Sequence, residues 1–139
     1  MALSVTWSEQ AGYRAATERA QGRCELTRVA GKLEHHHRVR RAQGVDHAPW
    51  NLLVVTPAVH DWFHVKPDRA KAGGWLLEGG GNPAGYPVYL WPADWFDPGW
   101  VLLRPADDGG PHIAELVDPQ HWLLPPYPAE LPPGFVSGS

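Results

Sequence analysis

The sequence predicts an α+β fold. We expect a short N-terminal helix, then a small strand, loop, strand and helix module, then a strand-rich, proline-rich C-terminal extension. Three observations support this prediction. Residues 51–55 form a compact apolar run of strand length, and Thr56 and Pro57 directly after it are typical of a helix start. The 139 residues also include 15 Gly, 15 Pro and 8 Trp, a composition that favours many turns and little long regular structure.

The first part of the chain predicts one helix and two short strands. Residues 11–21 are rich in helix formers and lack proline, and Gly22 follows where a helix C-cap would fall. Residues 26–37 contain a central turn signal that separates two short strands. Residues 38–50 have no periodicity, so we expect a loop there.

A second helix has a clear start and a clear end. A threonine at position 56 can cap the first helical N–H groups, and proline at the first helical position has no N–H to lose. The helix should run from about 57 to 65, because Pro67 cannot continue it. A further short helical turn is expected at 67–72, ending at the glycine pair 73–74.

The second half predicts strands joined by turns. Its expected elements are strands at 75–77, 88–91 and 100–103, a hairpin turn at 106–110 that returns through 112–116, and an extended or partly disordered proline-rich tail at 119–139.

Charge is unevenly distributed around a net charge of -3. Residues 14–41 hold eight basic and three acidic residues, a balance of +5, whereas residues 72–139 hold one basic and eight acidic residues, a balance of -7. A polyanion such as DNA would be attracted to the first segment and repelled by the second. Two solvated faces of opposite sign explain the same pattern.

Composition excludes several classes of protein. No run approaches the roughly 18 apolar residues that cross a bilayer, and residues 1–13 lack the basic start and apolar stretch of a secretory signal. We therefore expect a soluble, cytoplasmic protein with no membrane partner. The single cysteine, Cys24, excludes an internal disulfide and a zinc site made mainly of thiolates.

Histidine and asparagine side chains gather around the predicted strands and second helix: His35, His36, His37, Asn51, His60 and His64. His60 and His64 are four residues apart on the expected helix, so they project from one face and can share one metal ion. Such a pair alone is more often surface chemistry than a site. The preceding histidine run and an asparagine that can orient an imidazole favour a site here.

Three segments together resemble the HNH endonuclease motif: Glu34 to Arg38, Asn51 to Leu53, and His60 to His64. The similarity covers roughly residues 20 to 77 and is strongest to the short HNH proteins of actinobacterial phages, in which a strand-rich tail follows the motif. The resemblance implies the small ββα-metal fold, which holds one divalent ion. It places the nuclease domain at 1–77, with its core motif at 34–66, and a β-hairpin and Pro-rich extension at 78–139.

The resemblance also implies roles for single residues. His36, His60 and His64 correspond to the metal ligands, His37 to the general base, and Asn51 to the residue that fixes the base or its loop. The register is open by one position, with His35 as the ligand and His36 as the base in the alternative. Arg38 would assist catalysis. The expected nucleic-acid-binding residues are Lys32, Arg38, Arg40 and Arg41. For the three arginines, an ordinary solvated loop is an equally good interpretation.

The chain departs from many relatives, which carry two Cys-x-x-Cys pairs that bind a structural zinc. The corresponding positions here are Cys24 with Thr27 and Thr56 with Val59. We therefore expect no structural zinc, and apolar packing in its place by Leu26, Val54, Val59 and Trp62. The expected cofactor is one divalent ion, Zn, Ni, Mn, Co or Mg, and all-imidazole ligation suits the first four better than Mg.

The implied function is a metal-dependent endonuclease that nicks or cuts double-stranded DNA and leaves 5′-phosphate and 3′-hydroxyl ends. His37 would deprotonate the attacking water, and the ion would stabilise the leaving oxygen. In phages such proteins are homing enzymes or partners of the terminase and other packaging proteins, acting in the host cytoplasm, and the sequence leaves both roles open. The alternative is a non-catalytic DNA- or protein-binding module that keeps the ββα-metal fold.

Overall fold

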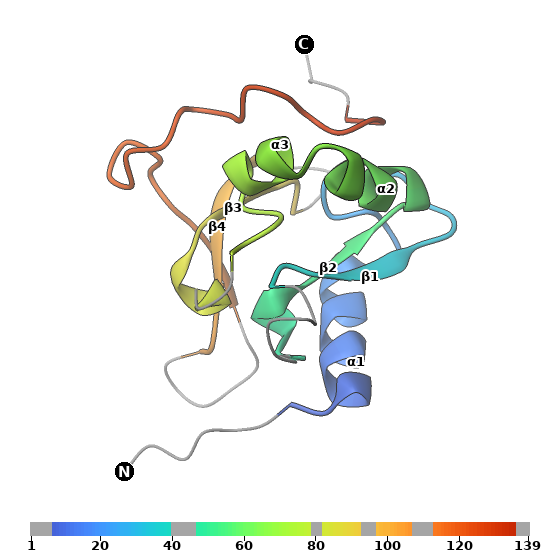
Figure 1. The fold of residues 1–139 in the computed structure, drawn as a ribbon. Coiled ribbons are helices and arrows are strands. Elements are labelled where there is room, and N and C mark those ends of the chain that lie inside the picture. Colours follow the sequence, from blue (N-terminus) through green and yellow to red (C-terminus); the bar gives the residue numbers. More distant parts are fainter. Residues whose placement is uncertain (1–6, 40–46, 79–81, 93–96, 107–112, 136–139) are drawn as a thin grey trace.

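The protein is described by a computed structural model that covers residues 7–39, 47–78, 82–92, 97–106 and 113–135. The helices in this part of the chain are α1 (Glu9–Ala20), α2 (Pro57–Val65) and α3 (Pro67–Ala72). The strands are β1 (Glu34–His37), β2 (Leu52–Val55), β3 (Val88–Leu90), β4 (Gly99–Arg104) and β5 (Ile113–Leu116). Strands β1 and β2 form one antiparallel sheet, and β3, β4 and β5 form another in that order. The predicted α+β class is confirmed (Figure 1).

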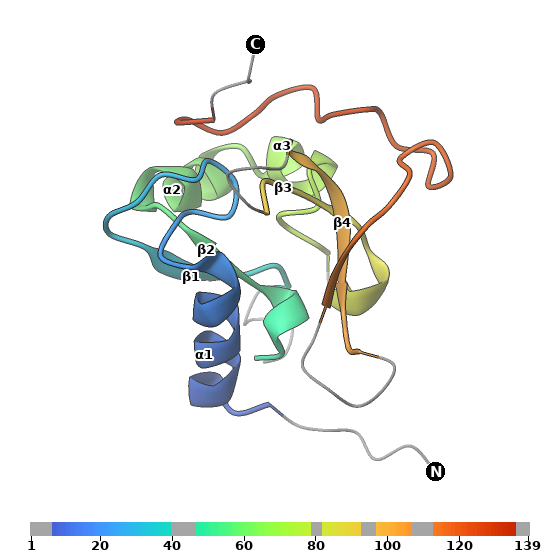
Figure 2. The same cartoon turned by 180° about the vertical axis from the view of Figure 1, so that it is seen from behind.

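Helix α1 begins slightly earlier than the sequence predicted, at Glu9, because Ser8 provides the N-cap. The Ser8 hydroxyl accepts a hydrogen bond from the N–H of Ala11 at 3.1 Å. The buried face of α1 consists of the small residues Gly12, Ala16 and Ala20. These let the helix approach the β1–β2 hairpin closely, and the hairpin lies between α1 and α2 (Figures 1 and 2).

Strand β2 is buried on both faces, which explains why its sequence is continuously apolar rather than alternating. Leu52 and Val54 pack with the small residues of α1, whereas Leu53 and Val55 belong to the main core on the α2 side. Asn51, which the sequence placed in this strand, ends the short 3-10 turn η2 (Pro49–Asn51) instead. It is wholly buried there.

The start of α2 is as predicted from Thr56 and Pro57. The Thr56 hydroxyl accepts a hydrogen bond from the N–H of Val59 at 3.3 Å, and Pro57 is at the first helical position. Both α2 and α3 match the predicted spans. Helix α2 therefore begins directly after β2 and lies beside β1 (Figure 1).

The predicted strand at 75–77 is wrong. The N–H of Trp75 donates to the carbonyl of Ala70 in α3 at 3.0 Å, so this N–H is not available for pairing with another strand. Only Leu77 makes a bridge, with Val39. The predicted strands at 88–91, 100–103 and 112–116 are found as β3, β4 and β5, and the predicted hairpin turn at 106–110 lies largely outside the described residues.

One hydrophobic core continues across the boundary expected at residue 77. Leu26, Phe63 and Trp75 from the first part pack in the same cluster as Val88 and Trp100 from the second. The backbone of the tail from Pro119 onward forms no helix or strand where it is described, yet it passes beside α3 in both views (Figures 1 and 2). The first part of the chain and the extension therefore share one hydrophobic core.

The tail is attached by specific contacts. Trp100 Nε1 donates to the carbonyl of Pro125 at 2.9 Å, and the Glu130 carboxylate forms ion pairs with Lys66 and Arg69. Partly buried apolar side chains of the tail, including Phe135, pack against the main core. Among the described residues, no helix is long and apolar enough to cross a membrane.

Candidate active site

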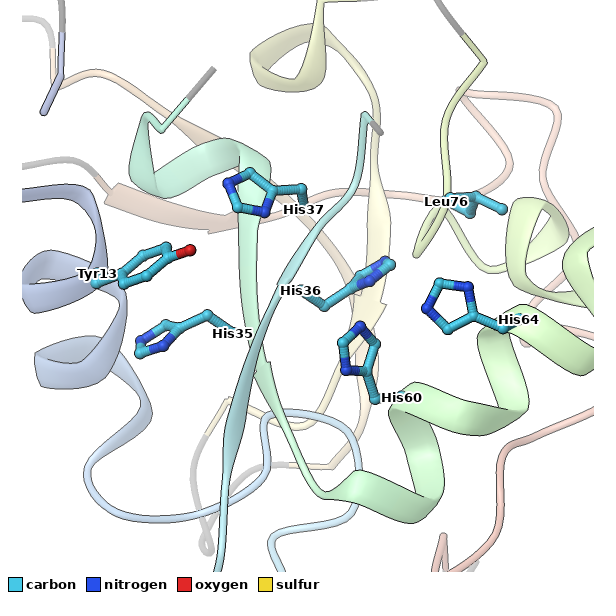
Figure 3. Close-up of a pocket in the computed structure, with 7 residues that line it drawn as sticks. All are labelled: Tyr13, His35, His36, His37, His60, His64 and Leu76. Carbon is cyan, nitrogen blue, oxygen red and sulfur yellow. The ribbon is translucent and has the colours of Figure 1, made fainter. Parts of the chain in front are cut away.

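A pocket of about 360 Å³ opens at the outer edge of β1. Its lining residues come from α1, β1, α2 and the segment after α3: Tyr13, His35, His36, His37, His60, His64 and Leu76 (Figure 3). Its volume is at the lower end of the range typical of small-molecule sites. Five of the predicted site residues therefore surround one space.

Strand geometry divides the histidine run between two sides. Successive side chains of a strand point to opposite faces, so His36 points toward α2, whereas His35 and His37 point toward α1 (Figure 3). His36 is 3% exposed, and its neighbours in the strand are only partly buried. The pocket joins the two sides around the edge of β1.

On the α2 side, three imidazoles lie together. The ring centres of His36 and His60 are 5.2 Å apart, and those of His60 and His64 are 5.1 Å apart. His60 and His64 are neighbours because they are one helical turn apart. His36 joins them because β1 runs beside α2. We call His36, His60 and His64 the α2-side cluster.

Two hydrogen bonds fix the protons of this cluster. The Glu34 carboxylate accepts from Nδ1 of His60 at 2.9 Å, and the Trp75 carbonyl accepts from Nε2 of His36 at 2.7 Å. Because both oxygens are acceptors only, these nitrogens carry the hydrogens in neutral rings, and the lone pairs are on Nε2 of His60 and Nδ1 of His36. Carboxylate and carbonyl partners of this kind commonly orient histidine ligands of metals.

Burial keeps His36 neutral. It lowers the pKa of His36 to about 3; the Trp75 carbonyl opposes this shift, and the nearby imidazoles of His60, His64 and His37 reinforce it. A neutral imidazole has a lone pair available at neutral pH, which metal ligation requires.

The spacing of the cluster suits a divalent ion. With metal–nitrogen bonds of about 2.0–2.1 Å, two imidazoles in tetrahedral array have ring centres about 5.2 Å apart. As the rings stand, no three His, Cys, Asp or Glu side chains of the described residues are arranged to hold an ion. The two ring separations therefore suit an ion, but the side chains do not form a ligand set in this conformation of the described residues. Rotation about χ2, a broad torsion, would redirect the exposed ring of His64 without moving the backbone or breaking the hydrogen bonds of His36 and His60.

His35 occupies a different environment. Its ring stacks on Tyr13 with centres 4.2 Å apart and planes 3° apart, and its Nε2 is 2.9 Å from the hydroxyl of Thr17. Burial lowers its pKa. Because His35 points toward α1, the α2-side cluster contains His36 and not the ligand of the alternative register.

His37 lies at the end of β1, on the α1 side. Its Nε2 is 3.2 Å from Nδ1 of His47, and its ring is edge-on to Tyr13. The side-chain oxygen of Asn51 accepts a hydrogen bond from the N–H of Val39 at 2.9 Å, and the backbone carbonyl of Asn51 accepts one from the N–H of Arg38 at 2.8 Å. Asn51 thus fixes the backbone of the two residues that follow His37.

The structure does not support the expected catalytic and phosphate-binding roles of Arg38. Its side chain is wholly buried, and its guanidinium donates to four backbone carbonyls, those of Trp50, Gly74, Pro83 and Tyr86, at 2.9 to 3.0 Å. Burial, followed by the charge of Arg19, lowers its pKa to about 9, so the group stays charged at neutral pH. A phosphate cannot reach it in this conformation.

The other expected nucleic-acid-binding residues differ in position. Lys32 is exposed on the turn before β1, where it can contact a polyanion. Arg40 and Arg41 lie outside the described residues.

Of the four positions that correspond to the two cysteine pairs, Cys24, Thr27 and Val59 are buried, and Thr56 is the partly exposed N-cap of α2. Cys24 and Val59 are fully buried in the main core, and Leu26 lies in the same cluster. Trp62 packs against that cluster, whereas Val54 belongs to the smaller cluster beside α1. Apolar packing thus fills this region.

The sequence analysis did not predict four side chains of the site, namely Glu34, Tyr13, His47 and the apolar lining residue Leu76. Glu34 was detectable, because residues two apart in a strand share a face and Glu34 is two residues before His36. Tyr13 had no distinguishing signal within its helix. His47 lies in a segment without periodicity, but a glycine inside the helical stretch of α1 indicated that some backbone approaches there closely.

Comparison with protein-family models, with curated proteins and with solved structures finds no match to this chain. A functional assignment therefore depends on the residues and geometry described above.

Proposed function

We propose that the protein is a metal-dependent endonuclease of the HNH class that hydrolyses phosphodiester bonds in double-stranded DNA, with β1, β2 and α2 as its ββα-metal module. The observation that carries the proposal is the grouping of His36, His60 and His64 on one side of β1, with His37 as the next residue on the other side. Both sides line one pocket. One proposed ligand, His36, and the proposed base, His37, are thus consecutive in the chain and point to opposite faces of β1.

The α2-side cluster would hold the ion. Glu34 and the Trp75 carbonyl leave a lone pair on His60 and on His36. When bound, a divalent ion supplies Lewis-acid stabilisation of the charge that develops on the phosphate and on the leaving oxygen.

His37 is the proposed general base. Hydrolysis forms a bond between the water oxygen and phosphorus and breaks the bond to the 3′ oxygen, and a base accepts the proton that the water loses. An imidazole titrates near neutral pH and suits this role. The hydrogen bonds of Asn51 to the backbone of residues 38 and 39 keep the end of β1, and so His37, in place.

The charge distribution supports a polyanionic substrate only in part. Arg38 and Arg19 are engaged inside the fold, since Arg19 binds Glu25 and two backbone carbonyls. Among the described residues, the exposed basic side chains of the first half of the chain include Arg14, Arg23 and Lys32. These remain the candidates for phosphate contacts.

Incubation of supercoiled plasmid with the pure protein and a panel of divalent ions tests the proposal. We expect conversion to relaxed or linear DNA that requires an ion, stops on chelation and is lost in His37→Ala. His121→Ala is the matched control, because His121 is exposed and lies far along the chain. Wild-type cleavage by His37→Ala would exclude His37 as the base. A fully inactive wild type that still binds DNA would favour the non-catalytic binding module.

A further inference from the structure

We infer that His47 is a positioning residue that holds the imidazole of His37 in its working orientation, an inference that rests on the proposed function. His47 is outside the ββα elements and contributes no ligand to the α2-side cluster. Its Nδ1 is 3.2 Å from Nε2 of His37, and the two ring centres are 5.3 Å apart.

The position of Glu9 indicates which of the two imidazoles donates the hydrogen bond between His37 and His47. Nε2 of His47 is 3.9 Å from the carboxylate of Glu9, which favours a hydrogen on that nitrogen. In a neutral His47 the lone pair is then on Nδ1, which accepts from Nε2–H of His37. His37 in turn has its lone pair on Nδ1, the nitrogen that would take the proton from water. Orienting a base through its second nitrogen is a general device of acid–base sites.

Helix α1 holds His47 in place through one face. Glu9, Gly12 and Tyr13 are spaced by three and four residues, so they share a side of the helix. Each meets His47: Glu9 through its carboxylate, Tyr13 through an edge-on ring contact at 6.2 Å, and Gly12 through the backbone. Several contacts with α1 therefore hold His47 in place.

Gly12 explains how this docking is possible. A Cβ added at this position would lie 1.7 Å from the carbonyl oxygen of His47, a distance that no side chain can adopt. Glycine inside a helix costs about 1 kcal/mol relative to alanine. Its presence in the middle of α1 lets the backbone of His47 approach the helix and so brings its ring to His37.

Two variants separate a positioning role from a merely structural one. His47→Ala removes the acceptor, whereas His47→Asn keeps an amide oxygen at the position nearest to Nδ1. The first measurement is made on chelated protein at about pH 8.5, where an ordinary imidazole is neutral. It detects the imidazole N–H proton of His37, assigned by its absence in His37→Gln.

We expect this proton to be protected from exchange in the wild type and in His47→Asn, and to be lost to solvent exchange in His47→Ala. In the plasmid assay at saturating metal, His47→Ala should be about 10- to 100-fold slower, as for other residues that orient a functional histidine. His47→Asn should recover most of the rate. The metal concentration for half-maximal activity should be the same in all three.

The outcomes distinguish this inference from the proposed function. A protected His37 proton together with wild-type nicking in His47→Ala would overturn the inference. So would equal loss of rate in both variants while His47→Asn keeps the protected proton. If the wild type cleaves no DNA, the proposed function fails, and the spectrum of His47→Ala still shows whether His47 holds His37.

Discussion

Arg38→Lys should strongly destabilise the fold, although it keeps the positive charge. The guanidinium donates through Nε to Gly74, through Nη1 to Trp50 and Pro83, and through Nη2 to Tyr86. A lysine ammonium is a single point with three donors, so at best it replaces the two bonds that share Nη1. The carbonyls of Gly74 and Tyr86 would then lose this donor.

A buried polar group left without a partner costs about 1–3 kcal/mol, so the two carbonyls together predict a loss of about 4 kcal/mol. This is a large part of the roughly 5–15 kcal/mol that stabilises a typical domain. Urea denaturation measures the loss, with Arg14→Lys on the exposed side of α1 as the matched control, expected to change stability by less than about 0.5 kcal/mol. Equal stability of the two variants would refute the structural role of Arg38.

Three other predictions concern the site and the tail. Glu34→Ala should weaken metal binding about 10- to 100-fold by calorimetry, because Glu34 orients His60, whereas Glu18→Ala on the exposed face of α1 should leave it unchanged. Because the pKa of His36 is about 3 when folded and ordinarily 6.5, the unfolded chain binds more protons between these values. The chelated protein should lose up to about 5 kcal/mol of stability as the pH falls from about 6.5 to 3, and a pH dependence identical to that of His36→Gln would contradict this. Deletion of residues 117–139 should lower stability by at least about 3 kcal/mol in thermal denaturation, since the deleted tail includes core-packing side chains such as Phe135; an unchanged melting temperature would show that the tail is dispensable.

Local patterns predicted the elements that position the site. Thr56 and Pro57 predicted the start of α2, and the continuous apolar run predicted the strand β2, which the structure buries on both faces. Both signals depend on short-range chemistry, a capping hydroxyl and the absence of polar positions. The spacing of His60 and His64 then followed from helical periodicity alone.

Other features depended on contacts distant in sequence. Nothing near Arg38 indicates that four carbonyls, the farthest at Tyr86, surround its guanidinium, so a basic loop was the natural interpretation. Likewise Trp75 has a strand-like sequence around it, but the end of α3 and the carbonyl of Tyr89 bind its two N–H groups. The burial of a charged side chain and the hydrogen bonding of the Trp75 N–H groups depend on tertiary contacts, which local sequence propensity does not predict.

In the proposed site, the metal ligands lie on the α2 side of β1 and the general base lies on the α1 side. The rate of plasmid nicking as a function of metal concentration tests it most directly, in the wild type, His60→Ala and His37→Ala. We predict that His60→Ala needs a higher metal concentration but recovers activity there, whereas His37→Ala stays inactive at every concentration. Activity of His37→Ala at high metal, or an unshifted midpoint in His60→Ala, would contradict this account.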